Sequence, residues 1–159
     1  MSETNKITKE DLIRLVDETV EYYKTNPRGL LFYTKKVDGR NQTVKKGCTY
    51  ADGDRCCAVG RLFSDDEKKT FGDYPSGVAY MVLHFEGIVP DVVLDYPTMF
   101  LTLLQRLHDT DLNWVDNDSG GCDLTPEGID EVNSIKDNID DIIDKQTGRE
   151  YRLEKGLIC

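Results

Sequence analysis

The sequence lacks any apolar run long enough to cross a lipid bilayer, and its first residues, 1–6, form no apolar leader. We therefore expect a cytoplasmic protein with no membrane partner. The cysteines also do not form the disulfide framework of a small secreted protein. The sequence has five cysteines, an odd number. Cys56 and Cys57 are adjacent, so a disulfide bond between them would be strained. We expect reduced thiols.

Familiar catalytic signatures are absent too. The sequence contains no phosphate-binding loop, dinucleotide fingerprint, metalloprotease motif or serine elbow. No two cysteines have the C-x-x-C spacing of a zinc site, and seven residues separate Cys48 from Cys56. These absences favour a non-enzymatic protein without a cofactor.

Length and composition predict one globular domain, residues 1–159. Hydrophobic residues make up 38% of the chain and charged residues 31%, which indicates a modest core under a charged surface. Apolar spacing and capping residues predict four main helices: 8–24, 76–86, 97–109 and 125–148. The segment 76–86 is apolar on nearly all sides, so we expect a buried central helix there.

Two Asp-Gly pairs, Asp38-Gly39 and Asp52-Gly53, predict tight turns between short strands. They place a small antiparallel sheet, with a hairpin near residues 30–57, beside the helices. Tyr151 and Leu153 predict a short terminal strand near residues 149–154, and the segment 110–123 is expected to be a loop. The predicted class is α+β, mostly helical, in a single domain.

The stretch Cys48–Phe63 holds three cysteines and changes from polar to apolar character. Free cysteine is commonly a small buried hydrophobe, so we interpret this stretch as the entry of the chain into the core, with Gly53 at the turn. One alternative is a structural zinc or thiol site built from residues able to bind metal: Cys48, Cys56, Cys57, His84 and His108. For thiol chemistry, the nucleophile would be Cys57, with a histidine and Asp109 as its partners.

Acidic residues are concentrated near the carboxyl end. Between Asp109 and Asp144 the sequence has twelve acidic residues and one basic residue, Lys136, whereas the net charge of the whole chain is −10. Phosphates would be repelled by this segment, so we expect no direct nucleic-acid binding there. The candidate binding residues are the acids of the last helix and its preceding loop, together with the loop's one large anchor: Asp116, Asp118, Asp130, Asp137, Asp141, Asp144 and Trp114.

Three interpretations of this acidic segment stay open. It is a solvated helix face, a surface that docks on a basic protein such as a nucleic-acid-binding protein, or a cation site. A calcium loop starting at Asp116 matches poorly, because Gly120 offers no side-chain oxygen and Pro126 interrupts the loop's end. A separate alternative is a small-ligand sponge whose pocket includes Arg55, Arg61 or Arg106.

Several short motifs resemble those of a loose set of small uncharacterised proteins from tailed bacteriophages and bacteria. The motifs are C-x-Y at 48–50 with Gly53, C-A-V-G-R-L at 57–62, L-Q-x-L-H-D at 104–109, N-W at 113–114 and L-T-P-E-G at 124–128. That set has no assigned activity, so the resemblance transfers no functional residue. It implies a small accessory protein, phage-encoded and located in the host cytoplasm. The localised acidic charge motivates a separate hypothesis, an inhibitor that blocks a host or defence protein through the acidic helix.

Overall fold

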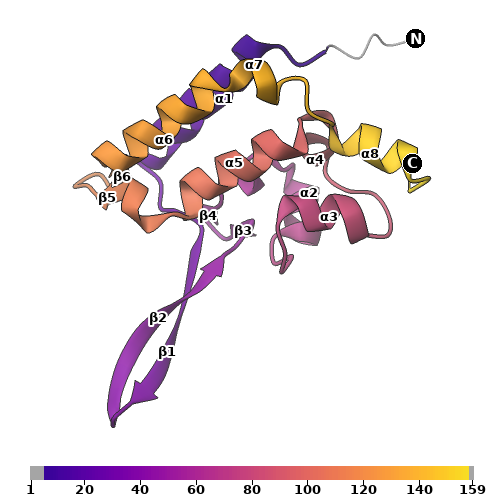
Figure 1. The fold of residues 1–159 in the computed structure, drawn as a ribbon. Helices are drawn as coiled ribbons and strands as arrows, with labels where there is room; N and C mark the ends of the chain where they lie inside the picture. The colour runs from indigo at the N-terminus through magenta and orange to yellow at the C-terminus, as the bar shows by residue number, and fades with distance from the viewer. Residues whose placement is uncertain (1–5, 158–159) are drawn as a thin grey trace.

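The computed structural model describes residues 6–157, and for residues 31–32 and 45–48 it describes the backbone alone. This part of the chain is α+β and mostly helical, as predicted. The helices form a body from which one long β-hairpin projects (Figure 1). No helix in the described range combines the length and hydrophobicity needed to span a bilayer.

The elements follow the chain in this order. The α-helices are α1 (Lys9–Tyr23), α2 (Asp65–Phe71), α3 (Val78–His84), α4 (Asp91–Asp95), α5 (Thr98–Asp109), α6 (Pro126–Asp137), α7 (Ile139–Ile142) and α8 (Gly148–Glu154). The strands pair as three separate antiparallel hairpins: β1 (Leu30–Val37) with β2 (Arg40–Cys48), β3 (Ala51–Asp52) with β4 (Arg55–Cys56), and β5 (Trp114–Asp116) with β6 (Cys122–Leu124). Two short 3₁₀ turns are η1 (Gly60–Leu62) and η2 (Asp111–Asn113).

Helix starts follow the capping residues of the sequence. The Thr8 hydroxyl accepts from the amide of Asp11 at 3.2 Å, and the Asp11 carboxylate accepts from the Thr8 amide at 2.8 Å. This capping box satisfies two amides that the first helical turn would leave without a partner. Ser64 and Glu67 make the same box at α2. The start predicted at residue 8 is confirmed.

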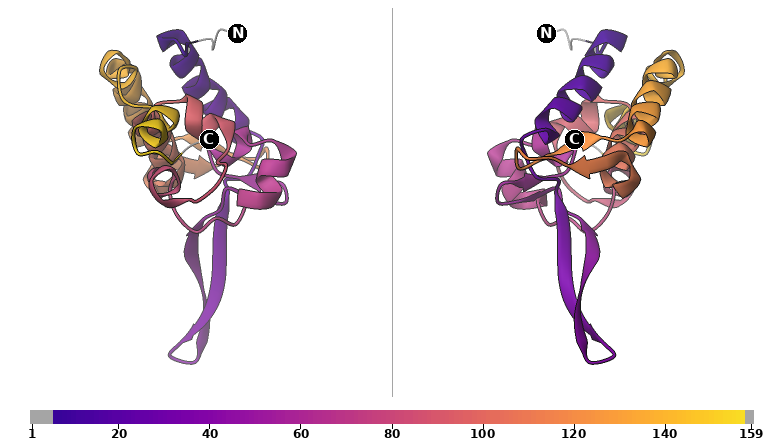
Figure 2. Two further views of the ribbon diagram at one scale, coloured as in Figure 1. Left: turned by 90° about the vertical axis from the view of Figure 1, so that its right-hand side faces the viewer. Right: turned by 90° about the vertical axis from the view of Figure 1, so that its left-hand side faces the viewer.

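The core lies where α5 is covered by α1 and by α6 with α7 (Figures 1 and 2). Of the apolar stripe that the spacing predicts for 97–109, Phe100, Leu104 and Leu107 have zero exposure, whereas Leu103 is half-buried; Leu101 is also fully enclosed. Leu12 and Val16 of α1 are equally enclosed. Burying large aliphatic and aromatic side chains contributes about 1.5–3 kcal/mol each, so these enclosed side chains contribute substantially to the stability of the body.

The stretch Cys48–Phe63 enters the core as predicted. Gly53 has a φ of +60°, the left-handed conformation that the turn between β3 and β4 requires. The chain is then buried without interruption from Cys56 to Gly60. The Tyr23 hydroxyl donates a hydrogen bond to the carbonyl of Cys56 at 2.6 Å and so ties this stretch to α1.

The β1–β2 hairpin stands apart from the body (Figure 2). Its turn residues, Asp38 and Gly39, have φ values of 51° and 76°. Two consecutive left-handed residues make the tight turn that matches the twist of the strands, so the Asp-Gly prediction is confirmed. The strands do not extend into one larger sheet, because β3 and β4 form a separate two-stranded ladder, and Cys56 of β4 makes only an isolated bridge with Arg28 beyond it.

The predicted terminal strand near residues 149–154 is wrong, because these residues belong to α8. Thr147 caps this helix by accepting from the amide of Glu150 at 3.1 Å. Its fully buried positions are Gly148 and Arg152, four residues apart, whereas Leu153 is 58% exposed. The buried face of α8 is therefore marked by a glycine and an arginine. A search for regularly spaced apolar residues does not detect such a helix.

Three further expectations differ from the structure. The segment 110–123 is not a plain loop, because it contains η2 and the β5–β6 hairpin. The helix expected over 125–148 ends at Asp137, and Asn138 has a non-helical ψ of 9° before α7 begins. Helix α3 is buried on one side only, with Tyr80 at 53% and Leu83 at 39% exposure.

Candidate functional site

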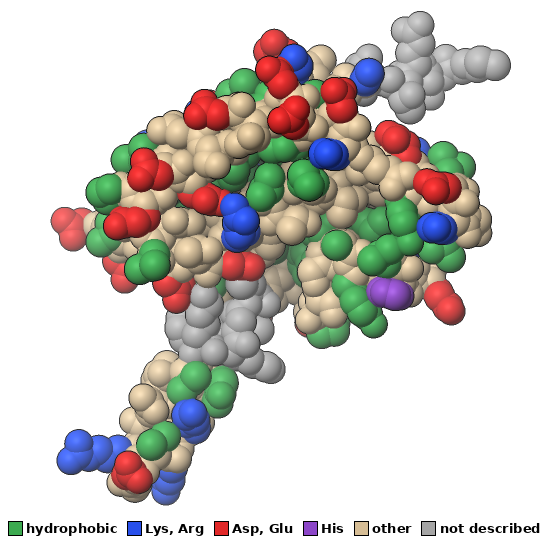
Figure 3. Space-filling model, viewed as in Figure 1, with side chains coloured by type: hydrophobic (Ala, Val, Ile, Leu, Met, Phe, Trp, Pro, Cys, Tyr) green, Lys and Arg blue, Asp and Glu red, His purple; other side chains and the backbone are tan. Residues whose placement is uncertain are grey.

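The four acids predicted on the last helix lie on the surface of α6, α7 and the turn after them. We call Asp130, Asp137, Asp141 and Asp144 the acidic ridge. All four are exposed, and acidic side chains follow the upper edge of the molecule over these helices in Figure 3. Their inward neighbours, Val132, Ile135, Ile139 and Ile142, are buried in the core.

Ion pairs hold the ridge helices against α1 but do not use the ridge carboxylates. Lys136 donates to Asp17 at 2.5 Å, and Lys9 of α1 pairs with Asp140. The hydrogen bond that Lys9 donates to the Asp140 carboxylate raises the pKa of Lys9 above its ordinary value. Within the described residues, no ion pair involves any ridge carboxylate. The ridge therefore presents carboxylates without ion pairs to solvent, and of these Asp144 lies near enough to Lys9 to help raise the pKa of that amine.

The acidic loop residues lie apart from the ridge. Asp116 ends β5 and Asp118 lies in the turn before β6, and both are exposed at the amino-terminal end of α6. Trp114 is 7% exposed, and its indole N–H donates to the carbonyl of Leu107 at 2.8 Å. Trp114 therefore anchors the β5–β6 hairpin on α5 and has little surface to offer a partner.

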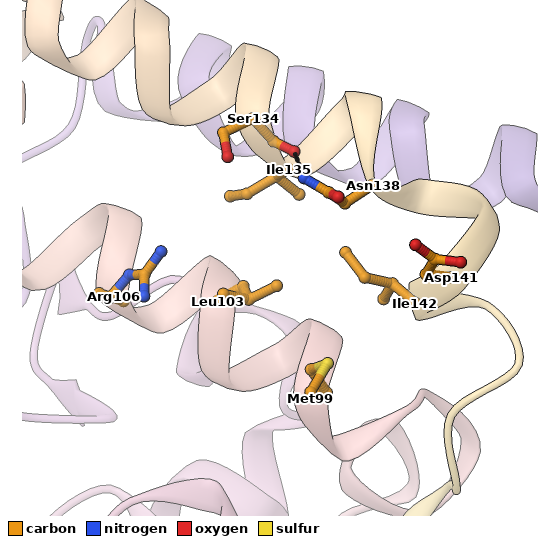
Figure 4. A pocket seen from close by; sticks show the side chains of 8 residues that line it. All are labelled: Met99, Leu103, Arg106, Ser134, Ile135, Asn138, Asp141 and Ile142. Atoms are coloured by element: carbon orange, nitrogen blue, oxygen red, sulfur yellow. Dashed lines mark hydrogen bonds between the residues drawn. The ribbon is translucent and has the colours of Figure 1, made fainter.

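A groove that the sequence pattern does not predict lies beside the ridge, between α5 and α6–α7. Its volume is about 300 Å³. It is lined by residues of both helical layers: Met99, Leu103, Arg106, Ser134, Ile135, Asn138, Asp141 and Ile142. Figure 4 shows the apolar side chains of α5 facing Ile135 and Ile142, with Arg106 toward one end and Asp141 toward the other.

The polar groups around this groove differ in their availability. Arg106 donates from Nε and Nη2 to Oε1 of Glu131, at 3.0 and 2.5 Å, so its charge is already paired. Asn138 donates to the carbonyl of Ser134 at 2.7 Å, as drawn in Figure 4. Asp141 remains without an ion pair among the described residues. The groove thus combines an apolar floor with one carboxylate, Asp141, and one paired guanidinium, Arg106.

The arginines proposed for a small-ligand site do not share one pocket wall. Arg61 donates to the Thr19 hydroxyl at 2.7 Å and lies over the ring of Tyr22, while Arg55 is exposed on β4. Only Arg106 lines the groove.

The cysteine and histidine candidates are also dispersed. His84 is exposed on α3 and contacts the Tyr80 ring, whereas His108 is fully buried in α5. The side chain of Cys48 lies outside the described residues. Among those that the structure does describe, no group of three or more His, Cys, Asp or Glu side chains is arranged to hold a metal ion.

His108 has structural partners on both ring nitrogens. Its Nε2 accepts from the amide of Gly29 at 3.1 Å, and its Nδ1 lies 2.7 Å from the carboxylate of Asp109. An Nε2 that accepts a hydrogen bond carries no proton, so Nδ1–H is the donor to Asp109. The ring connects the strand entry at Gly29 to α5, and neither nitrogen is left to serve as a base for a thiol.

Cys57 is buried and its sulfur accepts from the amide of Gly60 at 3.2 Å. Burial raises the pKa of the Cys57 thiol to about 12. The group is therefore a neutral thiol at physiological pH, whereas nucleophilic and metal-binding cysteines are thiolates. Desolvation likewise raises the pKa of Cys122 to about 11.

This burial predicts slow alkylation of Cys57. At pH 8 in native protein, iodoacetamide should modify Cys57 at least roughly a hundredfold more slowly than in urea-unfolded protein, because a raised pKa leaves little thiolate. Peptide-resolved mass spectrometry separates Cys57 from the other cysteines. Rapid native alkylation with a pH midpoint below 9 would contradict this structural role and restore the thiol-site alternative.

Comparison with known proteins adds no functional assignment. No protein-family model matches the chain, and no curated protein or solved structure shows significant similarity to it.

Proposed function

We propose that this chain is a non-enzymatic binding protein that holds a basic, partly apolar segment of another protein on the acidic ridge and in the adjoining groove. The partner is a protein with a basic surface, such as a nucleic-acid-binding protein of the host or of its defence systems. In this proposal the chain is a phage accessory factor that blocks its partner.

One observation carries the proposal: Asp141, a ridge carboxylate without an ion pair among the described residues, lines a groove with an apolar floor. An ordinary solvated face needs no such groove. Charge on the ridge would attract a basic partner from a distance and orient it, and burial of an apolar side chain against Met99 and Leu103, the more exposed apolar residues of the groove, would then slow its dissociation. Asp130 and Asp137 are seven residues apart on α6, about 10.5 Å along the helix axis, so they present a row rather than a point.

Neutralising the ridge is expected to weaken partner binding by about tenfold or more, because it removes four unpaired charges from the contact surface. The variant is D130N/D137N/D141N/D144N. The matched control, D52N/D54N/D73N/E86Q, removes the same charge from exposed residues elsewhere on the body. Tagged proteins are incubated with nuclease-treated bacterial lysate, and captured proteins are identified by mass spectrometry and then titrated individually by calorimetry.

The result expected is a basic protein captured by the wild type and by the control but lost from the ridge variant, with an affinity that falls as salt is raised. A captured set that is empty, or identical for all three proteins, would reject the proposal.

A second substitution tests the groove separately. Met99 is 48% exposed at the groove, so M99D should fold normally while placing a charge on the apolar floor. An added carboxylate attracts a basic partner, and a loss of affinity can therefore only reflect the lost apolar contact. L112D, at a residue 74% exposed on η2, is the control.

A further inference from the structure

The β1–β2 hairpin is a second charged surface, opposite in sign to the ridge. From Leu30 to Cys48 the sequence has five basic residues and one acid, a net charge of +4, which leaves −14 on the rest of a chain of −10. Lysine and arginine side chains gather at the end of this hairpin in Figure 3. The structure thus separates positive charge from an otherwise acidic molecule.

The hairpin is solvent-exposed along its outer half. Every residue from 33 to 43 is exposed, including Lys35, Lys36 and Arg40. An eight-residue strand such as β1 reaches roughly 26 Å, given a rise of about 3.3 Å per residue. No other element of the described chain packs along this part of the hairpin, since the views of Figures 1 and 2 show it projecting freely.

The strand register distributes basic groups over both faces of the ribbon. Lys35 pairs with Gln42 and Val37 with Arg40, which places the two bases on one face. Lys36 pairs with Asn41, on the opposite face. A ribbon with cations and amides on both faces suits a ligand that surrounds it, rather than a flat surface that meets one face.

We propose that the β1–β2 hairpin binds double-stranded DNA by lying in the major groove. That groove is about 12 Å wide and admits a two-stranded ribbon, with phosphates on both walls. Lys35, Lys36 and Arg40 meet the phosphates. The amide and hydroxyl side chains beside them, such as Asn41 and Gln42, donate hydrogen bonds to phosphates or base edges.

The acidic body does not prevent this contact. Charges are screened over about 8 Å at physiological ionic strength, and the hairpin tip extends roughly three times farther from the body. The expectation that nucleic acid is not bound was drawn from the acidic segment, which is a different surface. Repulsion by the ridge instead directs DNA to the hairpin alone.

Two other occupants are less well matched. The major groove of duplex RNA is too narrow to admit the ribbon. A second copy of this chain could offer its acidic ridge, but protein interfaces are depleted in lysine at their core, and lysine, threonine and amides dominate the exposed ribbon.

The test is fluorescence anisotropy with the full chain and a labelled 20-base-pair DNA duplex of mixed sequence, from 50 to 200 mM salt. We expect a micromolar dissociation constant at low salt. The triple variant K35Q/K36Q/R40Q should weaken binding by at least about tenfold and reduce the slope of log affinity against log salt by about 2 to 3, as expected for three lost phosphate contacts. The control K6Q/K69Q/K145Q removes the same charge from exposed sites on the body and should change affinity less than the hairpin variant.

Each remaining outcome decides the proposal. Absence of binding by the wild type at 50 mM salt, or equal losses in the two triple variants, overturns it. Equal affinity for duplex RNA of the same sequence overturns the major-groove contact. Self-association that depends on the hairpin, without duplex binding, assigns the hairpin to a second copy. The ridge variant should keep its DNA affinity, so failure of this inference is distinguishable from failure of the proposed function.

Discussion

Replacement of Arg152 by methionine is expected to lower the free energy of unfolding by roughly 3 kcal/mol or more. Arg152 is 3% exposed, and its guanidinium donates to four backbone carbonyls, at 2.9–3.1 Å: those of Val82, Phe85, Gly87 and Leu157. Methionine fills similar volume but donates nothing. The carbonyls in this enclosed site then lose their partner, and each buried polar group without one costs about 1–3 kcal/mol.

Arg149 provides a matched control on the same helix. Its one ion pair among the described residues, with Asp95 at 2.9 Å, joins two half-exposed side chains, so R149M should cost at most about 1 kcal/mol. Urea unfolding followed by circular dichroism measures both variants. The predicted order is a much lower midpoint for R152M than for R149M. Equal midpoints would show that the carbonyl contacts of Arg152 contribute little.

Arg152 also illustrates what the sequence could not reveal. A long charged side chain is ordinarily exposed, and only the meeting of α3, α8 and the following loop shows why this one is buried. Local signals were reliable: Thr8 and Ser64 cap helices, and Asp38-Gly39 forms a tight turn. Each of these features is determined within a few residues, so no tertiary contact was needed to predict it.

The candidate site also has parts that local sequence determines and parts that depend on tertiary contact. The exposed acids of α6 and α7 follow from helical spacing and were predicted, whereas the groove depends on how closely α5 approaches α6 and α7. Trp114 was predicted to bind a partner together with the acids, yet it is buried and its indole N–H donates to the Leu107 carbonyl on α5. The prediction that failed for this loop was about tertiary contact, not about residue type.

The two proposed surfaces impose different requirements on a partner. The ridge and groove attract a basic protein, while the hairpin attracts phosphate. If both are occupied together, the chain would hold a basic protein beside DNA without competing for the same contacts. In this arrangement the ridge contacts the partner protein and not DNA. The ridge would then cover the basic surface with which the partner itself binds DNA.

The second large effect is expected at Gly60, in the C-A-V-G-R-L motif. A Cβ at this position would lie 1.8 Å from the carbonyl oxygen of Tyr50 and 2.4 Å from its carbonyl carbon. Those atoms belong to backbone that is fixed on both sides. The Ala51 amide donates to Gly72, and the Tyr50 hydroxyl donates to the carbonyl of Ser76. The chain cannot move away without breaking these bonds, so G60A should lower the free energy of unfolding by about 3 kcal/mol or more.

Gly77 is the control for this substitution. It has a φ of −71° and no atom within 4 Å of an added Cβ, so alanine is tolerated there apart from a helix-cap effect of roughly 0.5–1 kcal/mol. Urea midpoints and soluble yield are compared for G60A, G77A and the wild type. Loss of soluble G60A with normal G77A agrees with the prediction, whereas G60A unfolding at the same midpoint as G77A contradicts it. The close approach at Gly60 then explains the glycine of this motif. The backbone at Gly60 and the backbone at Tyr50 pack so tightly that only glycine fits, and Cys57 and Val59 are buried beside them.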